Sequence, residues 1–171
     1  MGHPNRVIAE TPFLLSIAAL SASLAGLAGL VAALRRGEGL GTTDRFRLHQ
    51  IVEFCFANII LAIGIIPLVS ITGSAEASLR IGGAVAFAYV MLNGLILLRR
   101  LRRMEIPLTR SALAVVVGID VVVIVTSAAA ALTGAVGAYE ALLVALLARP
   151  MLAFLFVLSS FEAEKRPSPL P

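Results

Sequence analysis

Five long apolar stretches alternate with short polar segments along this chain of 171 residues. The stretches cover residues 12–34, 48–72, 81–98, 111–133 and 136–158. A helix needs about 20 residues, at about 1.5 Å per residue, to cross a bilayer, and each stretch is of that order. The pattern predicts an all-α integral membrane protein, a five-transmembrane-helix bundle over residues 12–160. Residues 1–11 are then an N-terminal tail and residues 161–171, which are rich in proline, a disordered C-terminal tail.

Composition supports the membrane class. Hydrophobic residues make up 59% of the chain and charged residues 14%, whereas soluble domains carry about 25% charged residues. The single cysteine, Cys55, lies inside the second apolar stretch and has no second thiol for a disulfide. We expect it to act as a small apolar filler.

The basic residues predict an orientation. Eleven of them flank the apolar stretches on one face of the membrane, and two, Arg6 and Arg80, fall on the other. The eleven are Arg35, Arg36, Arg45, Arg47, Arg99, Arg100, Arg102, Arg103, Arg110, Lys165 and Arg166. Because cytoplasmic loops carry the excess of basic residues, the N-terminus is predicted outside and the C-terminus inside. The excess of arginine over lysine and the abundance of alanine indicate a GC-rich bacterial genome. The expected location is therefore a bacterial cytoplasmic (inner) membrane.

A cleaved signal peptide is the alternative interpretation of the first stretch. Arg6 precedes the stretch, and small residues occur around Ser21-Ala22-Ser23. A basic residue before an apolar core and small residues after it are typical of a signal peptide with its cleavage site. However, the stretch is longer than an ordinary signal core and ends in Arg35-Arg36, which is typical of a stop-transfer segment. We therefore favour a first transmembrane helix.

Small residues on the first predicted helix form a stripe. They recur every three or four positions, at Ala18, Ala22, Gly26, Gly29 and Ala33. In lipid such a stripe lets helix backbones approach closely. Internal packing against the other helices is the favoured interpretation, and a dimerisation face is the alternative.

Two ionisable residues fall near the middle of the membrane. Asp120 on the fourth predicted helix and Arg149 on the fifth are both about 14 Å from the inner face. A lone charge at that depth costs about 2.5–3.5 kcal/mol on insertion scales. We therefore predict an Asp120–Arg149 ion pair facing the bundle interior, in a polar layer completed by Asn58 and Ser127. The pair is either a structural lock or part of a polar pathway.

A second polar cluster is predicted nearer the inner face. His49 and Glu53 are four residues apart and share a helix face, and Asn93 lies at a similar level. Two ligands are too few for a metal site, and no other His or Cys is placed to help. We predict no metal and no cofactor. The glycine-containing segments at Gly73 and Gly134, each preceded by threonine, are predicted to be equivalent outer turns.

The stretch from Leu48 to Arg103 carries a resemblance. It contains His49-Gln50-Ile51-Val52-Glu53, a helix reaching Pro67, a short outer turn, and a helix ending in Arg99-Arg100-Leu101-Arg102-Arg103. In these features it resembles a type of small, uncharacterised polytopic bacterial membrane protein. That resemblance implies no activity and assigns no functional residue.

The sequence favours a non-enzymatic scaffold or accessory membrane subunit, because it contains no nucleotide-binding loop and no catalytic arrangement. The alternative is a small transporter or channel component that moves protons, ions or a small solute through the polar layers. The expected partners are the lipid bilayer, anionic lipids at the inner face, and another membrane protein or a second copy of the chain. Nucleic acid is not expected, because topology accounts for the basic residues.

Overall fold

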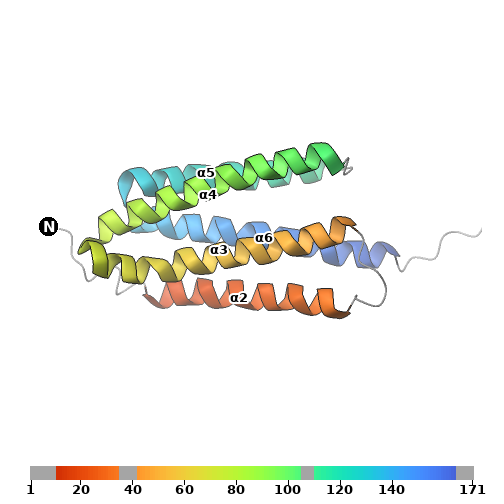
Figure 1. Ribbon diagram of the computed structural model, residues 1–171, viewed down its shortest axis with the longest axis horizontal. Helices are drawn as coiled ribbons and strands as arrows, with labels where there is room; N and C mark the ends of the chain where they lie inside the picture. Colours follow the sequence, from red (N-terminus) through yellow and green to blue (C-terminus); the bar gives the residue numbers. More distant parts are fainter. Residues whose placement is uncertain (1–10, 35–41, 105–109, 165–171) are drawn as a thin grey trace, which may run out of the picture.

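The computed structural model describes residues 11–34, 42–104 and 110–164, in which the chain forms five α-helices joined in antiparallel order (Figure 1). The helices are α2 (Thr11–Leu34), α3 (Thr42–Thr72), α4 (Ala75–Met104), α5 (Arg110–Thr133) and α6 (Val136–Glu164). Each contains a span long and apolar enough to cross a membrane. The all-helical architecture and the five apolar spans are therefore confirmed for this part of the chain.

Helices α3 and α6 form the centre of the bundle. Helix α2 packs mainly on α3 and also touches α6, while α4 and α5 pair along the opposite edge (Figure 1). Helix α5 packs on α6, and a less extensive interface between α3 and α4 completes a ring of four helices. A groove lies along the α3–α4 interface.

Helices α3, α4 and α6 extend about six residues past the predicted apolar stretches. Helix α3 begins at Thr42 and α4 spans Ala75–Met104, because polar turns continue these helices beyond the apolar stretches. Pairs within a helix support these turns: Arg47 Nη1 lies 3.4 Å from Asp44 Oδ1, and Arg80 Nη2 lies 2.6 Å from Glu76 Oε1.

The predicted boundary of the C-terminal tail is wrong by four residues. Helix α6 continues to Glu164, so residues 161–164 are helical rather than part of a disordered tail. The apolar pattern ends near residue 158, but a helix already stabilised by packing can extend one more turn into polar sequence. The rest of the tail, residues 165–171, and residues 1–10 of the N-terminal tail lie outside the described residues.

The two predicted outer turns are built alike. Gly73 and Gly134 both adopt φ of 64°, a left-handed conformation that favours glycine. Their N–H groups donate to the carbonyls of Val69 and Ala130, at 3.0 and 2.9 Å. In each turn the hydroxyl of the preceding threonine accepts a hydrogen bond from the amide two residues on. The two hairpins α3–α4 and α5–α6 therefore share one turn geometry.

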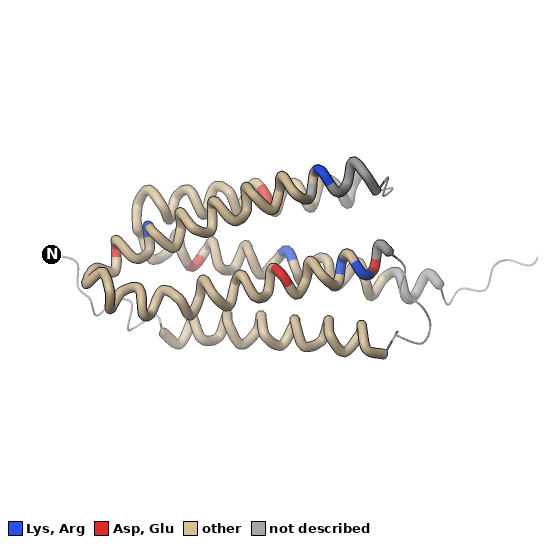
Figure 2. The backbone as a smooth tube through the Cα atoms, viewed as in Figure 1, with Lys and Arg blue, Asp and Glu red and all other residues tan. Residues whose placement is uncertain are grey.

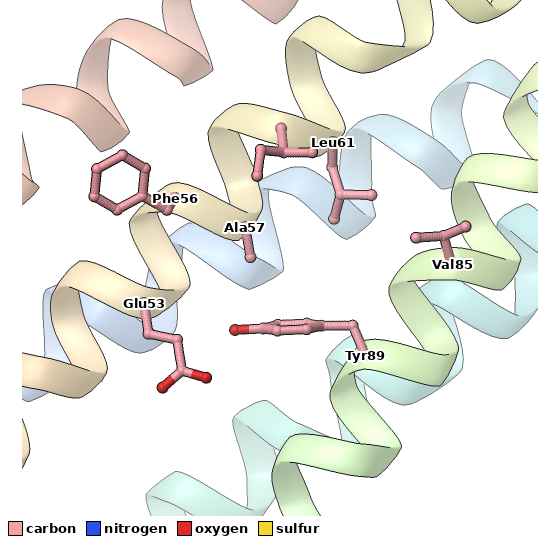
Figure 3. A pocket seen from close by; sticks show the side chains of 7 residues that line it. Glu53, Phe56, Ala57, Leu61, Val85 and Tyr89 are labelled. Atoms are coloured by element: carbon pink, nitrogen blue, oxygen red, sulfur yellow. The ribbon is translucent and has the colours of Figure 1, made fainter.

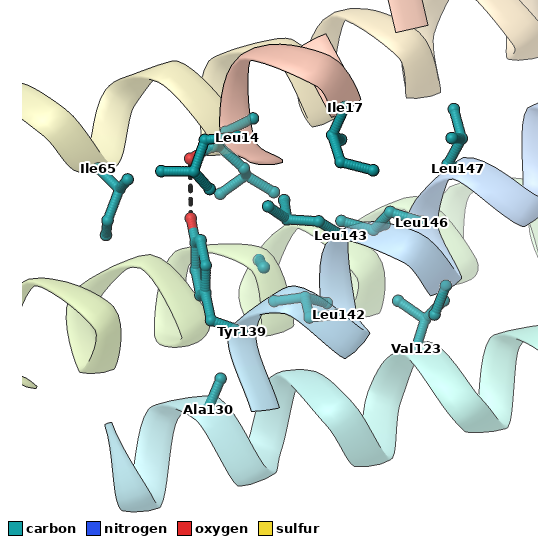
Figure 4. Packing of buried hydrophobic residues seen from close by; sticks show 14 of the residues in the cluster. Leu14, Ile17, Ile65, Val123, Ala130, Tyr139, Leu142, Leu143, Leu146 and Leu147 are labelled. Carbon is teal, nitrogen blue, oxygen red and sulfur yellow. Dashed lines mark hydrogen bonds between the residues drawn. The ribbon is translucent and has the colours of Figure 1, made fainter. Parts of the chain in front are cut away.

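The main apolar core surrounds helix α6. Tyr139, Leu142, Leu143 and Leu146 are buried there, against residues of α2, α3, α4 and α5 (Figure 4). The Tyr139 hydroxyl donates to the Leu61 carbonyl on α3 at 2.8 Å, drawn as a dashed line in Figure 4. This bond satisfies a phenol that would otherwise be stranded in an apolar interior.

A second apolar cluster lies between α2, α3 and α6. Its buried members are Ala28, Leu48, Ile51, Cys55 and Val157. Cys55 is completely buried in it as a free thiol, so the prediction of a small apolar filler is confirmed.

The predicted packing stripe on α2 does not face the bundle. Ala18 is buried, but Ala22, Gly26, Gly29 and Ala33 are exposed, and a Cβ added at Gly26 or Gly29 would meet nothing within 4 Å. The buried residues of α2 are instead Leu14, Ile17, Ala18, Ser21 and Ala28. Internal packing is therefore wrong for four of the five stripe residues, because Leu14, Ile17, Ser21 and Ala28 take the inward face together with Ala18. The dimerisation alternative remains a prediction.

Candidate functional site

Charged residues are sparse along the middle of the helices, as Figure 2 shows for the tan stretches of the backbone. Among the described side chains, Arg149 is the buried cation, with a side chain 10% exposed. Its position and partners define the centre of the candidate site.

The predicted ion pair between Asp120 and Arg149 is present. Arg149 Nη1 on α6 lies 3.1 Å from Asp120 Oδ1 on α5. The N–H groups of Arg149 do not point at this oxygen, so the contact is an ion pair without a well-aligned hydrogen bond. Mutual attraction offsets the cost of holding both charges away from water and links α5 to α6.

An aromatic pair connects Arg149 to helix α4. The guanidinium Cζ lies 4.2 Å from the centroid of the Phe54 ring on α3, a cation–π contact. Phe54 in turn packs edge-to-face against Tyr89 on α4, with ring centroids 5.9 Å apart. The positive charge of Arg149 is therefore stabilised from two sides, by a carboxylate and by the face of a ring.

The predicted inner cluster of His49, Glu53 and Asn93 also assembles. Asn93 Nδ2 donates to Glu53 Oε1 at 3.1 Å, and His49 Nδ1 lies 3.6 Å from Glu53 Oε2. Gln50 adds a third contact, donating from Nε2 to Glu53 Oε2 at 3.2 Å. The same Asn93 amide donates to the Tyr89 hydroxyl at 3.2 Å. Asn93 and Tyr89 thus link the inner cluster to the aromatic pair under Arg149.

Asn58 and Ser127 do not join the ion pair. Asn58 is completely buried, and its Nδ2 donates to Ser21 Oγ at 3.1 Å and to the Leu143 carbonyl at 3.3 Å. The Ser127 hydroxyl donates to the Ile124 carbonyl of its own helix at 2.9 Å. The prediction that Asn58 and Ser127 complete a polar layer around the ion pair is therefore wrong: the hydrogen bonds of Asn58 run to α2 and α6, and that of Ser127 stays within α5. Asn58 instead ties α3 to α2 and α6.

Two grooves flank helix α4, and each is lined by one carboxylate. The groove between α3 and α4 has a volume of about 310 Å³ and contains Glu53. The groove between α4 and α5 has a volume of about 190 Å³ and contains Asp120. Both carboxylates are therefore reached from the surface of the bundle, while Arg149 lies in its interior.

Sequence reasoning missed the residues that connect the polar groups. Phe54 and Tyr89 bridge the two clusters, Gln50 holds Glu53, and Ser21 is the partner of Asn58. The available signal was weak: Gln50 precedes Glu53 by three residues, and Tyr89 precedes Asn93 by four, which places each pair on one helix face. Nothing in the apolar pattern singles out Phe54 or Ser21.

Comparisons with family models, with curated proteins and with solved structures found no match. The class of protein therefore rests on the fold. Five described helices, each long and apolar enough to cross a membrane, define a multi-pass helical membrane protein.

Proposed function

We propose that the chain is a non-enzymatic scaffold or accessory subunit of a bacterial cytoplasmic membrane, with its N-terminus outside and its C-terminus inside. The observation that carries this proposal is that polar groups cross-link the bundle. Asp120–Arg149 joins α5 to α6, Asn58 joins α3 to α2 and α6, and Asn93 joins α4 to α3. Such cross-links hold a bundle in one arrangement, as a scaffold requires.

The outer surface of α2 supports the same proposal. The stripe of Ala22, Gly26, Gly29 and Ala33 faces away from the bundle, and small residues allow another transmembrane helix to approach closely. The partner is then a helix of another membrane protein or of a second copy of the chain. Arg45 and Arg99, exposed at the predicted inner end, are placed to contact anionic lipid head groups.

A second candidate is a small transporter or channel component. It is favoured by one specific observation: Glu53 and Asp120 line grooves on the two sides of α4 and are linked through Asn93, Tyr89, Phe54 and Arg149. Intramembrane ionisable residues commonly mark proton or ion pathways.

Reconstitution separates the two candidates. As an accessory subunit, the purified protein in liposomes passes protons and monovalent ions no faster than protein-free liposomes do. It also co-purifies with a membrane partner in fixed ratio, and Gly26→Leu removes that partner. The matched control is Leu27→Phe, because Leu27 lies about 100° around the same helix. Ion flux that disappears in a folded Asp120→Asn variant would overturn the accessory proposal in favour of the transporter.

A further inference from the structure

The groove between α3 and α4 has the form of a ligand site on the outer surface of the bundle (Figure 3). Its lining residues are Glu53, Phe56, Ala57, Ile60, Leu61, Val85 and Tyr89. Phe56, Ile60 and Val85 are exposed, so the groove opens on an apolar outer face of the bundle, the kind of face that a membrane protein turns toward lipid. Its volume of about 310 Å³ lies at the lower end of the range of small-molecule pockets, which is about 300–1,000 Å³.

One end of this groove carries the Glu53 carboxylate, which forms no ion pair with a buried cation among the described side chains. The Glu53 side chain is 37% exposed, and neutral amides of Asn93 and Gln50 hold its oxygens. Its ion-pair partner among the described side chains is His49, which is 68% exposed and 3.6 Å away. Arg149, by contrast, is already paired with Asp120. Among the described residues, this carboxylate beside apolar surface therefore has an exposed histidine as its ion-pair partner and no buried one.

Tyr89 adds an aromatic wall to the same place. Its ring extends from α4 into the space facing α3, with Glu53 across the groove from it (Figure 3). Its hydroxyl accepts a hydrogen bond from Asn93 at 3.2 Å, which fixes the position of the ring. The negative face of an aromatic ring attracts cations, most strongly where water is excluded.

We propose that the groove between α3 and α4 binds a hydrophobic organic cation. The positive centre lies between the Glu53 carboxylate and the Tyr89 ring, and its apolar substituents pack against Ala57, Leu61 and Val85. The groove beside Asp120 is not such a site, because Arg149 neutralises that carboxylate. This inference goes beyond the proposed function: the ligand is a small molecule rather than a partner helix, and binding needs no transport.

The test is equilibrium binding of radiolabelled tetraphenylphosphonium to the full chain in phosphatidylcholine nanodiscs. We expect one saturable site per chain. Glu53→Gln should weaken binding about tenfold or more, because it removes the counter-charge and keeps the shape. Tetraphenylborate, which has the same shape and the opposite charge, should show no saturable binding. Equal binding of the two ions, or unchanged affinity in Glu53→Gln, would overturn the proposal.

Matched variants separate binding from folding. Glu76→Gln removes a carboxylate at the start of α4, outside the groove lining, and should bind like the wild type. Val85→Phe should block binding by filling the groove, whereas Val121→Phe, on an exposed face of α5, should not. If Glu53→Gln fails to fold, the comparison of Val85→Phe with Val121→Phe tests the proposal instead. Equal binding of tetraphenylphosphonium by these two variants would overturn it.

Discussion

Asp120→Ala is expected to lower the free energy of unfolding by about 3 kcal/mol, because it leaves the Arg149 guanidinium buried without its counter-ion. A guanidinium stays charged in a protein, so in Asp120→Ala the Arg149 side chain cannot become neutral by losing a proton. Reversible unfolding of the purified protein by sodium dodecyl sulfate in mixed micelles measures the loss.

Arg149→Ala should lower the free energy of unfolding by less than Asp120→Ala does. In Arg149→Ala the remaining carboxylate can accept a proton, and the Asp120 side chain, 25% exposed, reaches the groove between α4 and α5. The double variant should lose less stability than the sum of the two single losses, with a coupling energy of about 1 kcal/mol or more. Strictly additive losses would show that the two charges do not stabilise each other.

Gly83→Ala is expected to destabilise the bundle by about 1–3 kcal/mol, because α4 and α5 leave no room for a methyl group there. A Cβ at Gly83 would lie 2.5 Å from the Ala131 amide nitrogen and 2.8 Å from the Ala130 carbonyl carbon. Both are backbone atoms, so the helices themselves must separate. The same unfolding assay reports the loss.

Gly64→Ala is the matched control for Gly83→Ala. Gly64 lies inside α3, and a Cβ there would meet nothing within 4 Å, so stability should stay the same or rise slightly. A Gly83→Ala protein as stable as Gly64→Ala would show that α4 and α5 are not in close contact at this position.

The apolar pattern was sufficient to predict the five described helices. A run of about 20 apolar residues has few alternatives to a transmembrane helix, and glycine after threonine marks both outer turns. The Asp120–Arg149 pair was also predictable, because two opposite charges at equal depth on successive antiparallel helices are each costly alone. The cluster of His49, Glu53 and Asn93 was predictable in the same way, from helix spacing and depth.

Which face of each helix turns inward was not predictable from hydrophobicity. Lipid and protein interior are equally apolar, so Leu14 facing inward and Leu30 facing outward have similar environments. The small-residue stripe of α2 therefore gave a wrong prediction of the inward face. Nothing in the sequence showed that Ser21, on the other face of this helix, would bond to Asn58. The grooves beside α4 depend on how far apart packed helices lie, and sequence spacing does not contain that distance.

The most direct test of a five-span chain with its basic segments in the cytosol is the accessibility of single cysteines in intact cells. In a Cys55→Ala background, Asn5→Cys and Ser74→Cys should react with a membrane-impermeant maleimide added outside. Ser168→Cys should react only after the cells are opened. External labelling of both Asn5→Cys and Ser168→Cys in intact cells would place the two ends on one side and contradict an odd number of crossings.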